Sequence, residues 1–227
     1  MDMIKAYCIN LDRRADRWAD SQHNHAAMGL PPGAVQRLAA VEDAQYGALG
    51  CTKSHVVALS HFLTQETAPL CLILEDDFDF HVPFDKFVDE LKALKEDKLD
   101  WDVLMLMGTL VTAARSHSHR AMRVIDACSS AAYLISRSYA PILLGCIAES
   151  IPQMEVLRNF EPRSFLQDRF PLDVMWRRLQ RRDRWYICAQ PLGAQRASFS
   201  DIQNASVNYD HATFGLKASA ADAKKPQ

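Results

Sequence analysis

The chain of 227 residues carries little net charge and no long uninterrupted apolar run. Its formal charge is −2 at pH 7, so no overall positive field favours nucleic acid as a partner. No apolar stretch approaches the roughly 20 residues that span a bilayer, and residues 1–5 show no hydrophobic segment of a signal peptide. We therefore expect a cytoplasmic protein that makes at most peripheral contact with the inner face of a membrane.

Paired cysteines and glycine-rich phosphate loops are also missing. The six cysteines are dispersed and none forms a CxxC pair, so the spacing typical of zinc sites is absent. Cys8, Cys71, Cys146 and Cys188 lie in apolar segments, as small buried side chains of a protein in a reducing compartment do. The chain lacks a glycine-rich phosphate loop followed by Lys-Ser or Lys-Thr, which disfavours nucleotidyl or phosphoryl transfer.

The stretch LCLILEDD at residues 70–77 places five apolar residues directly before three acids. The uninterrupted apolar run predicts a strand buried on both faces, as in the middle of a parallel sheet. Glu75, Asp76 and Asp77 then follow at the carboxyl end of that strand, where open α/β sheets bind ligands. Because adjacent carboxylates repel one another, a divalent cation carrying a sugar-nucleotide diphosphate would stabilise them, as would full solvation of an ordinary acidic loop.

Strand and helix patterns alternate along the chain and predict an α/β fold with a mostly parallel central sheet flanked by helices. The expected strands are residues 4–11, 36–41, 70–74, 101–107, 123–125, 131–135 and 185–189. The expected helices run from Asp12 as N-cap to about Ala27, from Thr52 or Ser54 to Glu66, from Phe84 to Leu94, from Ser136 to Ile147 and from Pro171 to Leu179. Residues 112–120 and 150–170 are expected to be irregular, and residues 195–202 to form a polar loop.

Cationic and polar side chains follow two of these predicted elements. Arg13, Arg14 and Arg17 suit phosphate because a guanidinium presents a planar fork of donors, although they also fit a solvated helix face paired with aspartates. A second candidate is the glycine-containing segment before a predicted helix N-terminus that carries Ser54 and His55, since free N–H groups there bind anions. His55 alone also fits an ordinary structural histidine.

Three further groups each fit a functional and a structural interpretation. His117 and His119 have a spacing that a metal accepts, but solvated loop histidines fit equally. The arginines at residues 177–184 fit a solvated helix end, or contact with an anionic acceptor or a membrane surface. Asp173 stands in the first turn of a predicted helix, where a catalytic base or a carboxylate that complements the helix dipole would both be in place.

Six segments, in order, resemble those of glycosyltransferase family 25, which includes bacterial lipooligosaccharide galactosyltransferases and collagen galactosyltransferases. They are residues 9–17 (INLDRRADR), 50–55 (GCTKSH), 74–77 (LEDD), 133–136 (YLIS), 171–173 (PLD) and 198–202 (SFSDI). Each segment is short, but their order and spacing extend the resemblance over roughly residues 4–202.

The resemblance implies a GT-A type fold, in which a Rossmann-like nucleotide half joins an acceptor half. We expect a single domain at residues 1–210, with the nucleotide-sugar half at about 1–110, the acceptor half at about 111–210 and a flexible tail at 211–227. The implied activity is inverting transfer of galactose from UDP-galactose to a glycan, a lipid-linked oligosaccharide or a protein, as in lipopolysaccharide biosynthesis. The implied cofactor is Mn²⁺ or Mg²⁺. A catalytically inactive, nucleotide-sugar-binding relative is the alternative.

The resemblance also implies roles for individual residues. Asp77 and Glu75 match the metal motif, and Asp173 matches a segment that would supply the catalytic base, with His55 or Asp201 as alternatives. The residues implied to bind the nucleotide-sugar donor are Asn10, Leu11, Arg13, Arg17, Ser54, His55, Glu75 and Asp76.

Overall fold

The computed structural model describes residues 3–114, 119–200 and 205–207. The central sheet contains β1 (Ile4–Asn10), β2 (Val35–Ala39), β3 (Leu70–Glu75), β5 (Val103–Met105), β6 (Thr109–Ala114), β7 (Ala121–Cys128), β8 (Ala132–Ser136) and β9 (Trp185–Cys188). Their spatial order is β2-β1-β3-β8-β5-β9-β7-β6. All but β7 and β8 run in the same direction, which confirms the predicted α/β class with a mostly parallel sheet.

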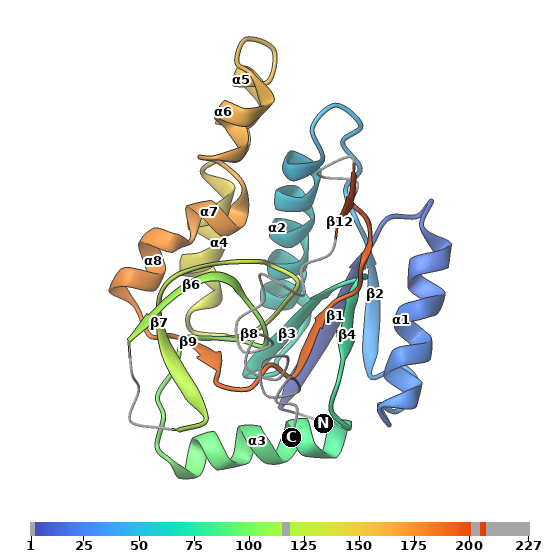
Figure 1. Ribbon diagram of the computed structural model, residues 1–227, viewed down its shortest axis with the longest axis vertical. Helices are drawn as coiled ribbons and strands as arrows, with labels where there is room; N and C mark the ends of the chain where they lie inside the picture. The colour runs from blue at the N-terminus through green and yellow to red at the C-terminus, as the bar shows by residue number, and fades with distance from the viewer. Residues whose placement is uncertain (1–2, 115–118, 201–204, 208–227) are drawn as a thin grey trace, which may run out of the picture.

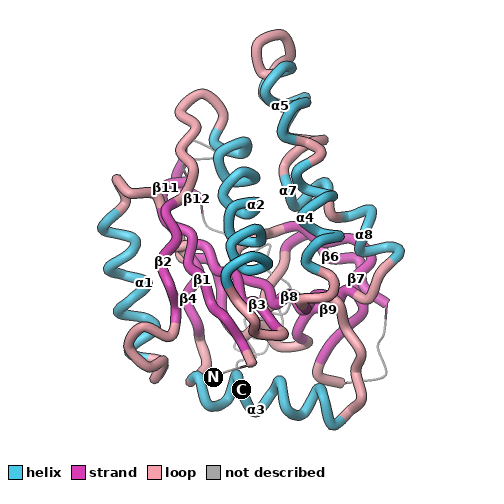
Figure 2. The backbone as a smooth tube through the Cα atoms, turned by 180° about the vertical axis from the view of Figure 1, so that it is seen from behind, coloured by secondary structure: helices cyan, strands magenta, loops and turns pink. Residues whose placement is uncertain are grey.

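Helices cover both faces of this sheet (Figures 1 and 2). They are α1 (Ala15–Ala27), α2 (Gly47–Gln65), α3 (Phe84–Glu96), α4 (Ala140–Ala148), α5 (Ile151–Leu157), α6 (Arg163–Gln167), α7 (Leu172–Met175) and α8 (Arg177–Arg182). Two short antiparallel ribbons complete the described fold: β4 (Phe78–Phe80) pairs with β10 (Gly193–Gln195), and β11 (Ser198–Ser200) pairs with β12 (Ala205–Val207).

Strand β3 is buried on both faces, as its apolar run predicts. Cys71 and Ile73 belong to the core beneath α2, α4 and α7, whereas Leu72 and Leu74 belong to the core that includes α3. Successive side chains of a strand point to opposite faces, so one continuous apolar segment supplies both cores. Each fully buried Leu or Ile contributes roughly 1.5–3 kcal/mol relative to exposure, which makes β3 a central element of the fold.

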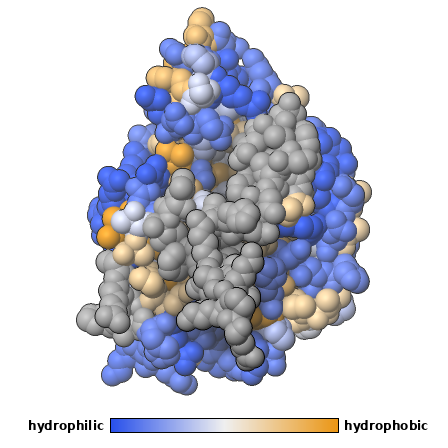
Figure 3. Space-filling model, in the orientation of Figure 1, coloured by the Kyte–Doolittle hydropathy of each residue, from blue (hydrophilic) through white to orange (hydrophobic). Residues whose placement is uncertain are grey.

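The segment expected to be irregular at residues 150–170 instead contains α5 and α6, which stand above the body of the molecule as an arm (Figure 1). Met154 and Leu166 of the arm are buried against Leu49 of α2 in a small third core. This burial stabilises α5 and α6, because helices this short are not stable in isolation. Phe160, in the loop between α5 and α6, is 80% exposed. Figure 3 shows hydrophobic colour at the top of the molecule.

One apolar segment is longer than the sequence led us to expect, because we expected no stretch long enough to span a bilayer. Residues Ala140–Leu157 run through α4 and α5 and, by length and a mean hydropathy of 1.2, pass the criterion for a membrane span. However, Leu143, Cys146 and Ile147 of α4 are buried in the core beside α2. Although only 33% of the window is buried, this packing places α4 in the core, which weakens the window as a sign of a membrane span.

Helix α2 begins at Gly47, so Gly50, Ser54 and His55 lie inside the helix rather than at its start. The prediction that a helix N-terminus at Ser54 and His55 offers free N–H groups to an anion is therefore wrong. Gly50 does not form a turn. A glycine is required there because a Cβ atom would lie 2.6 Å from the carbonyl oxygen of Val41.

Other predicted boundaries also need correction. Asp12 and Ser136 are not N-caps: the cap positions are Arg14 and Tyr139, and neither makes a side-chain capping bond. Asp12 instead accepts a hydrogen bond from Arg37 at 2.6 Å. Part of the expected loop at residues 112–120 is strand β6, and strands β10, β11 and β12 follow the strand predicted to be last. The predicted tail at 211–227 lies outside the described residues, and the division into halves stays a prediction.

Candidate active site

A cleft of about 790 Å³ opens at the carboxyl ends of β1 and β3. Among the residues that line it are nine that the sequence singles out: Leu11, Arg13, Arg17, Ser54, His55, Glu75, Asp76, Asp77 and Asp173. Asn10 is the exception, since it is 1% exposed and does not line the cleft. The fold therefore brings together residues from β1, α1, α2, β3 and α7 that are far apart in the sequence.

Asp76 is held by the protein on both of its oxygens. Asn10 donates to Oδ2 at 2.6 Å, and Arg17 donates to Oδ1 at 2.8 Å. Ser21 of α1 also donates to the backbone carbonyl of Asp76 at 2.8 Å. Burial raises the pKa of Asp76, although Arg17 and Asn10 oppose that rise. Asn10 and Asp76 thus tie β1, β3 and α1 together.

Asp77 faces the cleft with weaker protein contacts. Arg17 donates to its Oδ2 at 3.2 Å, and Gln195 donates to its Oδ1 at 3.4 Å. Burial, followed by the neighbouring charge of Glu75, raises the pKa of Asp77 to about 7. A divalent cation at this carboxylate would offset the repulsion from Glu75.

The contact from Gln195 depends on the ribbon of β4 and β10. Gly193 pairs with Phe80 so closely that an added Cβ would lie 2.2 Å from the carbonyl oxygen of Asp79. Only a glycine allows this approach, which also lets the backbone N–H of Arg196 donate to the carbonyl oxygen of Asp77 at 2.7 Å.

Glu75 is oriented toward α2 by three side chains. Its Oε1 accepts from Ser130 at 2.5 Å, lies 3.3 Å from His55 Nε2 and lies 4.0 Å from the sulfur of Cys51. Burial alone would raise the pKa of Glu75, but the bonds from His55 and Ser130 outweigh it and lower the pKa. Within the described ranges no hydrogen bond reaches Oε2, so one carboxylate oxygen stays available to a ligand in the cleft.

His55 is fully buried and connects Glu75 to the core. Its Nδ1 lies 3.0 Å from the hydroxyl of Tyr133, and the two rings are stacked with centroids 5.8 Å apart. These contacts fit the structural interpretation of His55 and also make it one of the residues that position Glu75.

Asp173 lies on the wall formed by α7. The backbone N–H of Ser129 donates to its Oδ2 at 3.1 Å, and burial raises its pKa. Ser129 has a φ of 87°, in the left-handed region that non-glycine residues rarely adopt. Strained backbone of this kind concentrates at functional sites, and here it directs an N–H toward a candidate base.

The lining of the cleft is acidic overall. It contains the carboxylates of Glu42, Asp43, Glu75, Asp76, Asp77 and Asp173 and the guanidiniums of Arg13, Arg17 and Arg163. Six carboxylates against three guanidiniums give a formal charge of −3 when all are ionised. An anionic ligand such as a nucleotide diphosphate would be repelled from this cleft unless a cation entered with it.

Sequence reasoning missed several lining residues. Cys51 lies one helical turn before His55, so helical spacing alone could have found it. Ser130 and Gln195 come from a turn and a short strand with no local signal. Asp201, the alternative base, and His117 both lie outside the described residues.

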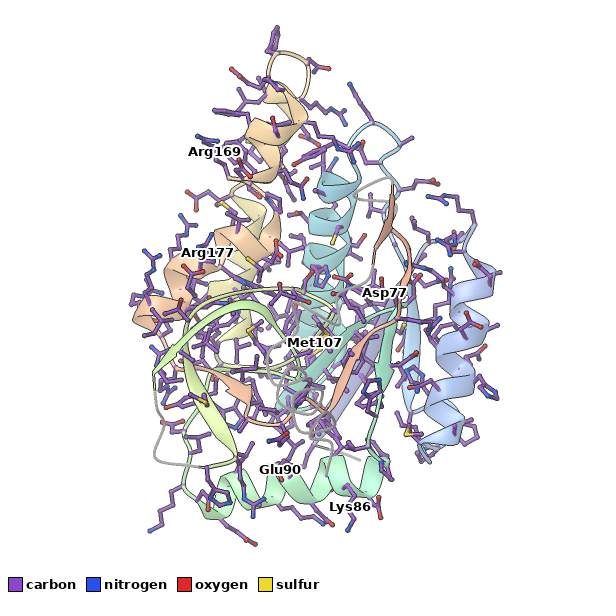
Figure 4. All side chains as sticks on the ribbon, in the orientation of Figure 1. Asp77, Lys86, Glu90, Met107, Arg169 and Arg177 are labelled. Atoms are coloured by element: carbon purple, nitrogen blue, oxygen red, sulfur yellow. The ribbon has the colours of Figure 1, made fainter. Side chains whose placement is uncertain are left out.

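The arginines at residues 177–184 do not belong to the cleft. Each pairs with a carboxylate: Arg177 and Arg181 with Asp126, Arg178 with Glu149, Arg182 with Asp183, and Arg184 with Asp100 and Asp102. Figure 4 shows Arg177 of α8 on the left of the molecule and Asp77 to the right of its centre. This pairing supports the interpretation of a solvated helix end.

No protein-family model matches the chain, and no curated protein matches it. The solved structures that match the chain include the following three. Mannose-1-phosphate geranyltransferase from Thermus thermophilus matches with 8% identity and a TM-score of 0.49, over 86% of this chain and 76% of that one. A putative glucose-1-phosphate thymidylyltransferase from Bacillus anthracis matches with 11% identity and a TM-score of 0.38, over 80% of this chain and 66% of that one. HddC from Yersinia pseudotuberculosis matches with 13% identity and a TM-score of 0.32, over 61% of this chain and 59% of that one. At this level the similarity concerns the fold and assigns no activity.

Proposed function

We propose that the protein is an inverting glycosyltransferase of family 25 that moves galactose from UDP-galactose to a hydroxyl group of a glycan or glycoconjugate. The observation that supports this most is the meeting of Glu75, Asp77 and Asp173 in one open cleft at the carboxyl ends of parallel strands. Ligands bind at this position in open α/β sheets, and the three carboxylates offer both metal ligands and a base.

The donor would bind together with a divalent cation, because the cleft is acidic. Asp77 and Glu75 would hold Mn²⁺ or Mg²⁺, since carboxylate oxygens are the donors that hard cations accept. The ion would stabilise the negative charge that develops on the leaving diphosphate. Arg13, whose ion pair with Glu42 at 2.7 Å is about half exposed, lies in the same cleft and could turn toward a phosphate.

Asp173 would act as the general base. As the acceptor oxygen attacks C1 of the sugar, its proton passes to Asp173, the bond from C1 to the diphosphate oxygen breaks, and UDP leaves. Burial raises the pKa of Asp173, so its carboxylate is a stronger base than an exposed aspartate. His55 would act by holding Glu75 in place.

Calorimetric titration with UDP tests the metal requirement. We expect measurable binding in Mn²⁺ and much weaker binding in chelator, because the cleft otherwise repels the diphosphate. Equal affinity in the two buffers would remove the cation from the proposed function.

A screen of nucleotide sugars tests the activity itself. Metal-dependent release of UDP from UDP-galactose supports glycosyl transfer or its hydrolytic side reaction. Binding of UDP without any turnover would identify an inactive relative. Release of pyrophosphate from a nucleoside triphosphate and a sugar phosphate would instead identify a nucleotidyltransferase.

A further inference from the structure

We propose that Cys51, His55 and Glu75 form a binding site for a borderline-soft divalent cation such as Zn²⁺ or Co²⁺, separate from the cation that would enter with the donor. Cys51 and His55 lie one turn apart on α2, and Glu75 ends β3. One ligand atom from each residue lies within 4.8 Å of the other two, and all three residues line the cleft.

The spacing of the three ligand atoms is close to that of a tetrahedral site. With Zn–N, Zn–O and Zn–S bonds of about 2.0–2.3 Å, tetrahedral angles place neighbouring ligand atoms about 3.3–3.6 Å apart. His55 Nε2 and Glu75 Oε1 are 3.3 Å apart, and Cys51 Sγ and Glu75 Oε1 are 4.0 Å apart. Small side-chain movements would therefore complete three corners of the tetrahedron. The fourth corner would be filled from the cleft, as in zinc sites that bind an exchangeable ligand.

The surroundings of the three residues also fit metal ligands. The hydroxyl of Tyr133 lies 3.0 Å from His55 Nδ1. In the metal-bound state Nδ1 would carry the imidazole hydrogen and donate a hydrogen bond to this hydroxyl, which leaves Nε2 without hydrogen and able to bind the cation. Ser130 donates to Glu75 and fixes the carboxylate. Such contacts to the far side of the ligands are a regular feature of protein metal sites.

Binding would replace protons by the cation. The Cys51 thiol would lose its proton, and the imidazole hydrogen of His55 would move from Nε2, which lies 3.3 Å from Glu75, to Nδ1. The cation forms its bond to sulfur as the thiol proton leaves to the buffer, with no change in oxidation state. Glu75 would bind through Oε1, which leaves Oε2 for the donor cation, so the two sites would share this residue.

Cobalt provides the test, because its absorption reports the ligands directly. Full-length protein treated with chelator is titrated with Co²⁺, without nucleotide or sugar. We expect one equivalent to produce the thiolate-to-cobalt charge-transfer band in the near ultraviolet and the intense visible bands of a tetrahedral site. One equivalent of Zn²⁺ should abolish them. Absence of the thiolate band in the unaltered protein overturns the proposal.

Two variants separate this site from the other thiols. Cys51→Ser should remove the band and weaken Co²⁺ binding by more than the roughly 10–100-fold that loss of an outer-shell partner costs. Cys128→Ser makes the same change at a half-buried cysteine of β7 outside the cleft, and should leave the band intact. A band that persists in Cys51→Ser overturns the proposal.

Alkylation supplies a readout that needs no variant. One equivalent of Zn²⁺ should protect Cys51 of the unaltered protein from iodoacetamide, as read by peptide mass, and unchanged alkylation refutes the site. None of these measurements uses UDP or a sugar. Their outcome therefore tests the metal site independently of the proposed glycosyl transfer.

Discussion

Replacing Arg17 by methionine tests the charge balance of the acid cluster. The guanidinium side chain is 11% exposed and binds Asp76 Oδ1 at 2.8 Å and Asp77 Oδ2 at 3.2 Å. Methionine keeps much of the aliphatic volume but removes the cation between adjacent carboxylates. Breaking a buried ion pair by removing one partner costs roughly 3–5 kcal/mol. For a chain of this length the melting temperature should therefore fall by about 6–20 °C.

Arg13→Met is the matched control for this change. The Arg13–Glu42 pair is 2.7 Å long, but its side chains are 47% and 53% exposed. Exposed pairs contribute about 0–1 kcal/mol, so this variant should unfold close to the unaltered protein in urea. If Arg17→Met loses no more free energy of unfolding than Arg13→Met, the argument from burial is refuted.

The same variant reports on the proposed donor cation. A ligand that binds only the folded state stabilises it in proportion to the logarithm of its concentration over Kd. Without Arg17, a divalent ion near Asp77 and Glu75 would supply the missing positive charge, so Mn²⁺ should raise the melting temperature of Arg17→Met more than that of the unaltered protein. Equal shifts would place the ion away from these acids.

Three further predictions concern separate parts of the molecule. Asp173→Asn should lower kcat by about 10²–10⁴-fold with UDP affinity and melting temperature nearly unchanged; a carboxylate that only complements its helix would lose little activity. Burial lowers the pKa of His25 below its ordinary value of 6.5, so the unfolded chain binds this proton more tightly. The free energy of unfolding should therefore fall as pH drops through 6.5, and His25→Leu should flatten that part of the profile in urea unfolding. Thiol titration of denatured protein, prepared without reductant and protected from air, should find all six cysteines reduced; a lower count would indicate a disulfide.

Elements with a strong local pattern could be predicted from the sequence. The apolar run of β3 and the amphipathic spacing of α3 each determine their own burial, and both helix and strand lie where the pattern indicates. The arm of α5 and α6 could not be predicted in this way. Its helices are five to seven residues long and depend on Met154 and Leu166 packing against α2.

The candidate site likewise contains residues that a local pattern predicts and residues that only the fold brings there. Glu75, Asp76 and Asp77 could be predicted because they directly follow the apolar run of β3 in one continuous segment. Ser130 and Gln195 could not, since they reach Glu75 and Asp77 through contacts 55 and 118 residues apart in sequence. The start of α2 was misplaced because Gly50 resembles a turn residue locally, whereas its reason is the nearby backbone of Val41.

Asp76 and Asp77 are adjacent in sequence, yet the structure predicts different consequences when each is changed to asparagine. Both lie in the turn between β3 and β4 and accept from Arg17, but Asp76 also accepts from Asn10, whereas Asp77 accepts from Gln195. Asp76→Asn removes a buried, charge-assisted acceptor and should cost about 1.5–3 kcal/mol of stability, with Kd for UDP in Mn²⁺ nearly unchanged. Asp77→Asn removes a proposed metal ligand and should weaken that binding strongly while the protein stays folded. Urea unfolding should therefore show the larger loss of stability in Asp76→Asn, and calorimetry should show the larger loss of UDP binding in Asp77→Asn. If Asp76→Asn weakens UDP binding more than Asp77→Asn does, Asp76 contacts the donor complex directly, and the assignment of Asp77 as the metal ligand is wrong.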